Sequence, residues 1–99
     1  MNMKRIFKYE VKIEDEQVLA LPSDAEILHF GLQSGVPYIW VKLDPKELLN
    51  PEKPLNRRFK VVGTGHVFSD EFTEYIGTVI GHEDVFVWHL FEIKETDEI

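Results

Sequence analysis

Cysteine is absent from the sequence. A chain without thiols has no disulfide framework and no thiolate nucleophile, which fits a reducing compartment. Long apolar runs are also missing, because no stretch approaches the ~18 residues of a membrane-spanning helix. The basic start, residues 1–5, leads into an alternating segment and not into the apolar core of a signal peptide. We therefore predict a soluble, cytoplasmic protein without a membrane partner.

Positive charge is scarce, with 11 Lys and Arg against 18 Asp and Glu and a net charge of −7. This deficit disfavours direct binding to nucleic-acid phosphates. It suits a partner protein with a basic surface. A net negative charge also keeps a small domain in solution. The charge alone does not show whether it serves a basic partner or only solubility.

Motifs for metal, cofactor or catalytic chemistry are lacking as well. The four histidines show no i,i+2 or i,i+4 pairing, so we predict no metal site. The full dinucleotide and phosphate-loop patterns are absent, and we predict no cofactor. Hydroxyl and carboxylate residues are available, but no spacing places a base beside a nucleophile. The protein is predicted not to be an enzyme.

Short alternating or apolar runs separated by turn residues are what the sequence does contain. They predict strands at residues 6–13, 17–21, 25–33, 38–43, 56–62, 75–80 and 85–91. We expect the first two to form a hairpin around residues 14–16, and 81–84 to join the last two. Asp44 and Pro45 open one helical turn at most. The predicted fold class is all-β: an antiparallel sandwich or barrel of about seven strands, with short helical turns only.

Ninety-nine residues with 43% hydrophobic content make one β domain, residues 1–99. Its core spans about 6–92, and 93–99 form an acidic tail. The run 85–91 is apolar on both faces and is expected to be a central strand. Six side chains should therefore be largely buried: Phe7, Phe30, Phe59, Phe86, Val87 and Trp88.

Charged residues at alternate positions mark exposed strands, Lys8, Glu10 and Lys12 in the first and Arg58 and Lys60 in the fifth. Such charges limit edge-to-edge growth yet permit a closed pair. The chain also has seven Phe, three Tyr and two Trp. Because Tyr38 and Trp40 share a face with Lys42, we place them at or near a binding surface and predict a homodimer.

The segment Gly63, Thr64, Gly65, His66 is the sharpest local feature. Two glycines let the backbone turn tightly and present N–H groups to an anion. The alternative is a bend where the fifth strand leaves the sheet. His89 is either a core histidine or part of a pocket with His66, Tyr75 and Trp40, and such a pocket would suit a nucleotide-like ligand.

Three segments together, 63–66 (GTGH), 75–78 (YIGT) and 87–92 (VWHLFE), resemble an uncharacterised family of small proteins encoded by phages and prophages. The resemblance runs from about Ile6 to Glu92. It implies a phage origin and a host-cell cytoplasm, and it brings no catalytic residues. We expect a non-enzymatic phage accessory protein that acts by binding, and its acidic charge and small sheet suit inhibition of a host defence protein. Sequestration of a nucleotide-like ligand near residues 63–66, or a minor virion component, are the alternatives.

Overall fold

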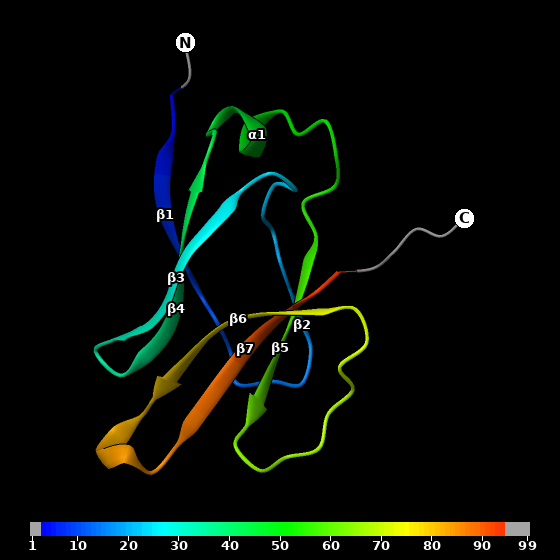
Figure 1. Cartoon of the computed structure of the whole chain (residues 1–99). Helices are drawn as coiled ribbons and strands as arrows, with labels where there is room; N and C mark the ends of the chain where they lie inside the picture. The colour runs from blue at the N-terminus through cyan, green and yellow to red at the C-terminus, as the bar shows by residue number, and fades with distance from the viewer. Residues whose placement is uncertain (1–2, 95–99) are drawn as a thin grey trace.

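The computed structural model describes residues 3–94 (Figure 1). Its elements follow the chain as seven strands, one α-helical turn and one 3-10 turn: β1 (Arg5–Glu10), β2 (Gln17–Leu19), β3 (Glu26–Gln33), β4 (Val36–Leu43), α1 (Lys46–Leu49), β5 (Arg57–Gly63), β6 (Thr73–Ile80), η1 (His82–Asp84) and β7 (Val87–Ile93). The all-β fold class and the single short helix are confirmed, and more than a third of the chain is strand.

Two antiparallel sheets make up the fold. The first, sheet A, has the order β1-β4-β3, and the second, sheet B, has the order β2-β5-β7-β6. The sheets do not join into a closed barrel, so the structure selects the sandwich from the two predicted architectures. β7 lies between β5 and β6, which confirms it as a central strand.

The predicted hairpin of the first two strands is wrong. β1 pairs with β4, whereas β2 pairs with β5 in the other sheet. The segment between them crosses from sheet A to sheet B, and the Val61 N–H donates to the Glu14 carbonyl at 3.2 Å on the way. The predicted exposure of the fifth strand is also corrected, because β5 is flanked by β2 and β7. The other predicted hairpin, β6–β7, is present.

The core lies between the inward faces of the sheets. Strand alternation sends Ile39 and Val41 inward from β4 and Phe59 and Leu90 inward from sheet B, and each is essentially inaccessible to solvent. Of the six predicted core residues, Phe30 and Phe59 are buried, and Phe7, Val87 and Trp88 are half-buried.

Phe86 was predicted to be buried, and that prediction is wrong, because its side chain is 52% exposed. Phe86 precedes β7 in the loop of the β6–β7 hairpin, where no second layer covers it. Its ring instead stacks on Trp88, with centroids 6.0 Å apart.

β3 and β6 bring the two sheets into contact. A Cβ on Gly77 would lie 3.3 Å from the Phe30 Cβ, so a larger residue would push the strands apart. Each of these strands also carries a register irregularity, between Ile27 and His29 in β3 and between Tyr75 and Gly77 in β6.

The linker from β4 of sheet A to β5 of sheet B contains α1. The Asp44 carboxylate accepts a hydrogen bond from the Lys46 N–H at 2.9 Å and so starts the turn as predicted. Within residues 3–94 there is no helix long and apolar enough to cross a membrane. Of the predicted acidic tail, residue 93 ends β7 and residues 95–99 lie outside the described part.

Candidate binding face

A crossover connection covers part of the outer face of sheet B. β5 and β6 both run antiparallel to β7, so they are parallel to each other, and loop 64–72 must return along the sheet to connect them. We call this loop the strap. Its Phe68 ring packs on Phe91 of β7 at 5.0 Å between centroids, and the Lys60 ammonium donates to the Ser69 carbonyl at 3.2 Å. The strap therefore lies on the side of the sheet that faces away from the core.

The Gly63–His66 segment, where β5 ends and the strap begins, forms a tight turn. The His66 N–H donates to the Gly63 carbonyl at 3.1 Å, and Gly65 has a φ of +88°, a conformation that L side chains rarely adopt. The next element of the described chain after this turn is β6, so the turn does not lead into a helix. The backbone reversal accounts for the glycine at position 65 without a bound anion.

His89 is the centre of a polar band across the outer face. Its Nε2 lies 2.7 Å from the Thr64 hydroxyl and its Nδ1 lies 2.8 Å from the Thr78 hydroxyl, which is 2.6 Å from the Tyr75 hydroxyl. Residues from β5's end, β6 and β7 thus form one continuous hydrogen-bonded chain. His89 is a half-buried surface residue, not a core histidine.

The Thr64–His89 pair has the distance of a nucleophile and its base. The partner of the other ring nitrogen is the neutral hydroxyl of Thr78 and not a carboxylate. A hydroxyl in that place holds the ring in position but provides no negative charge to stabilise an imidazolium. The geometry accounts for a rigid polar surface more readily than for an activated nucleophile.

An aromatic cluster adjoins this band. Tyr75 packs edge-on against Phe91 with ring centroids 5.6 Å apart, and Phe68 also packs on Phe91. Tyr75 is 57% exposed, and Phe72 and Val67 in the strap are exposed as well. We call the surface formed by Phe68, Tyr75 and Phe91 the aromatic face.

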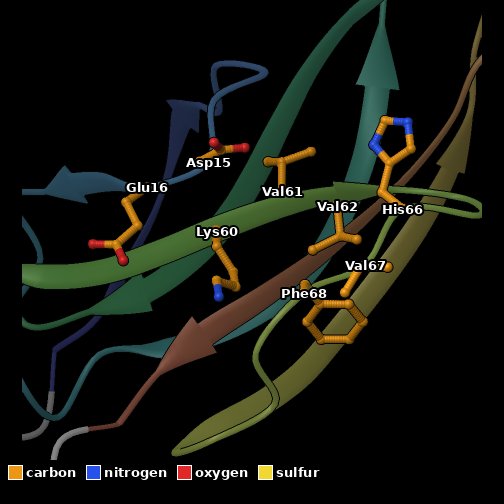
Figure 2. Close-up of a pocket in the computed structure, with 8 residues that line it drawn as sticks. All are labelled: Asp15, Glu16, Lys60, Val61, Val62, His66, Val67 and Phe68. Carbon is orange, nitrogen blue, oxygen red and sulfur yellow. The ribbon is translucent and has the colours of Figure 1, made fainter.

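The predicted pocket of His66, His89, Tyr75 and Trp40 does not form. Figure 2 shows the His66 side chain on the side of β5 that carries Val61, opposite to the side that carries Val62 and Phe68. His66 consequently lies near Trp88, across the sheet from His89. Only His89 and Tyr75 share a surface, through Thr78.

Tyr38 and Trp40 lie on the other side of the molecule. They point outward from β4 because the alternate residues Ile39 and Val41 are buried in the core. Their rings are 5.9 Å apart, and Trp40 is also 5.9 Å from His29. This second cluster belongs to sheet A, so it cannot complete a site on the outer face of sheet B.

A hollow of about 270 Å³ lies between the strap and the β1–β2 connection (Figure 2). Its lining includes Lys60, His66 and Phe68, together with the carboxylates of Asp15 and Glu16 from the β1–β2 connection. The two carboxylates oppose an anionic ligand, and a hollow of this size is at the lower limit of ligand pockets.

Sequence reasoning missed Phe68, Thr78 and Phe91. The alternation that placed His89 and Phe91 on one face was visible in the sequence and pointed to Phe91. Thr78 lies opposite His89 only because the register of β6 is irregular. Phe68 contacts Phe91 only because the strap returns across the sheet.

A family model described as Domain of unknown function (DUF7352) matches residues 3–99. The chain belongs to this family. The match confirms the expectation of an uncharacterised domain family that covers nearly the whole chain. No curated protein and no solved structure matches the chain. Membership in DUF7352 names no activity.

Proposed function

We propose that this DUF7352 domain acts by binding another protein through its aromatic face, without catalysis. The observation that carries the proposal is the group of exposed aromatic side chains there. Tyr75 of β6 and Phe68 of the strap are 57% and 39% exposed, and both rings pack on Phe91 of β7. Exposed aromatic residues gathered on one surface are typical of the energetically dominant part of protein interfaces.

Charge at the border of this face defines the kind of partner. Asp70 and Glu71 lie in the strap, and Glu83 and Asp84 lie in the β6–β7 turn at the other end of β6. Lys60 is the basic residue that packs against the strap. With a net charge of −7, this arrangement favours a partner with a basic surface and speeds its association.

The resemblance to phage and prophage proteins supports a setting for this interaction. We propose that the partner is a protein of a bacterial host, and that occupation of its basic surface inhibits it. A host defence protein that uses a basic surface to hold nucleic acid fits this chemistry. An acidic domain would compete for that surface by charge and by shape.

The test begins with affinity capture from infected host cells and continues with the captured protein in purified form. Tyr75→Ala should raise Kd about thirtyfold or more, the effect of losing ~2 kcal/mol at an interface hot spot. Tyr38→Ala is the matched control, because it removes the same side chain from the opposite sheet. Binding should also weaken as salt rises. Equal affinity of wild type and Tyr75→Ala would refute the aromatic face as the binding site.

The hollow beside His66 supports a second candidate, sequestration of a nucleotide-like ligand. Phe68 offers a ring for stacking and Lys60 offers a cation. Asp15 and Glu16 repel phosphate, so this candidate ranks below protein binding. Titration with a panel of nucleotides separates the two, because saturable binding that His66→Ala abolishes would favour the ligand.

A further inference from the structure

The four edge strands of the two sheets differ in how well they are protected from pairing. β2 has only three residues, and β3 and β6 are irregular in register and lie against each other. Short length, bulges and covering neighbours are the usual protections of a sheet edge. β1 has none of them: it pairs with β4 in unbroken register over six residues and contains no proline.

The backbone of β1 offers hydrogen-bonding groups on its free side. The Val11 N–H donates to the Pro37 carbonyl at 3.0 Å, so the odd-numbered residues exchange hydrogen bonds with β4. The groups of Ile6, Lys8 and Glu10 therefore point away from the sheet. An incoming strand would meet three consecutive donor and acceptor pairs.

Lys8 could protect this edge by its charge, but its side chain points away from the open side of β1. The Lys8 ammonium donates to Gln33 of β3 at 2.7 Å and lies 4.4 Å from the centre of the Tyr38 ring on β4. Its side chain thus crosses the sheet and leaves the outer edge. Ile6, on the same face of β1, is 58% exposed, so an apolar side chain lies near the open edge.

We propose that β1 pairs antiparallel with β1 of a second copy, about a twofold axis at Phe7. This proposal is independent of the host partner. In this register Lys4 lies opposite Glu10 of the second copy and Glu10 lies opposite its Lys4, which makes two cross-strand pairs of opposite charge. Ile6 lies opposite the stem of Lys8 and diagonally across from Ile6 of the second copy.

The neighbouring symmetric register is less favourable. An axis at Lys8 would place the two Lys8 residues opposite each other and Lys4 opposite Lys12, which pairs like charges. Both registers use the outward-pointing groups of the even residues, so the charges select between them. The axis at Phe7 converts the exposed edge into a closed, isologous interface.

The dimer doubles sheet A to six strands in the order β3-β4-β1-β1-β4-β3. Because a twofold axis perpendicular to a sheet keeps each face on its own side, both Tyr38–Trp40 clusters lie on one continuous surface. The predicted homodimer thereby places Tyr38 and Trp40 beside the interface and not within it.

Charge reversal with rescue tests the pairing. Sedimentation equilibrium of the wild type at micromolar concentration should report twice the 11.6 kDa chain mass. Lys4→Glu and Glu10→Lys should each raise the dissociation constant of the dimer about tenfold, because two attractive pairs become two repulsive ones. The double variant should recover wild-type affinity. Lys53→Glu, in the exposed loop before β5, is the control for net charge.

A monomer at all micromolar concentrations overturns the proposal. A dimer that tolerates both single reversals overturns the pairing at β1. If the single reversals weaken the dimer but the double variant fails to restore it, the register at Phe7 is wrong. An equal effect of Lys53→Glu attributes the change to overall charge and also overturns the register.

Discussion

Arg57 and Glu92 form a nearly buried ion pair, and its removal is the most demanding test of the fold. The side chains are 14% and 7% exposed, and two parallel hydrogen bonds join them, Nε to Oε2 at 2.7 Å and Nη2 to Oε1 at 2.8 Å. Nη1 also donates to the carbonyls of Pro22 and Ala25, at 3.1 and 2.6 Å. The guanidinium thus ties two strands of sheet B to the segment that leads into β3.

Arg57→Ala leaves the Glu92 carboxylate buried without its main partner and the Ala25 carbonyl without its Arg57 donor, whereas the Pro22 carbonyl still accepts from the Ala25 N–H. Loss of one member of a buried pair costs roughly 3–5 kcal/mol. A domain of this size has a total stability of only ~5–15 kcal/mol. The variant should therefore lose a large part of its unfolding free energy, with Lys94, whose Nζ is 3.8 Å from Glu92, offsetting a small fraction.

Urea denaturation followed by tryptophan fluorescence measures the loss. With an m value near the lower end of the usual range, about 1–1.5 kcal/mol/M, the midpoint should fall by at least ~2 M. Arg58→Ala is the matched control, because the Arg58–Glu16 bridge at 2.9 Å is exposed to solvent and should contribute no more than ~1 kcal/mol.

A second variant distinguishes a buried charge from lost packing. Arg57→Met with Glu92→Leu removes both charges and keeps apolar volume, so it should be more stable than Arg57→Ala. It should remain below wild type, because the Ala25 carbonyl still lacks its Arg57 donor. A loss below about 1 kcal/mol for Arg57→Ala would show that the pair does not hold the sheets together and would refute this reasoning.

Three further predictions follow from burial and hydrogen bonding. Phe59→Ala should cost ~3–5 kcal/mol of unfolding free energy because Phe59 is fully buried. Trp88→Ala should cost less because Trp88 is half-buried. If chemical denaturation shows a larger loss for Trp88→Ala, this assignment of the core residues is wrong. Burial raises the pKa of Tyr9 above its usual 10.0, so the unfolded state releases the phenol proton at a lower pH than the folded state does. The free energy of unfolding should therefore fall as the pH rises from 10.0 toward the folded pKa. Tyr9→Phe should remove that part of the fall, and an unchanged pH profile would exclude Tyr9 as its source. Thr78→Val should shift the His89 ring signals in NMR spectra while it costs only ~1 kcal/mol in stability, and unshifted signals would argue against the Thr78–His89 hydrogen bond.

Alternation in the sequence predicted the strands and most of their faces, because the inward and outward sides of a strand follow from a period of two residues. Ile39, Val41, Tyr38 and Trp40 all lie where that period places them. Which strands pair with each other was harder to predict from the sequence. The polar segment at 14–16 has the composition of a hairpin turn, and nothing local shows that it passes between two sheets.

The candidate site was predicted only in part for a related reason. His89 and Tyr75 were placed on one surface, but His66 was expected beside them. The turn at Gly63–His66 directs the His66 ring to the other side of β5, and this direction depends on a backbone conformation and not on spacing. Phe68 lies far from Phe91 in sequence, and only the path of the strap brings their rings together.

The crossover of the strap also determines the order in which the two sheets can form during synthesis. Sheet A takes all its strands from residues 5–43, so it can assemble as soon as that part of the chain has left the ribosome. Sheet B cannot, because β5 and β6 are joined only through β7, the last of the described strands. Until β7 emerges, the inward face of sheet A, with Ile39 and Val41, has no second layer to cover it. During synthesis the nascent chain should therefore expose an apolar surface for the time needed to translate the second half, and this is the interval in which a chaperone would bind it.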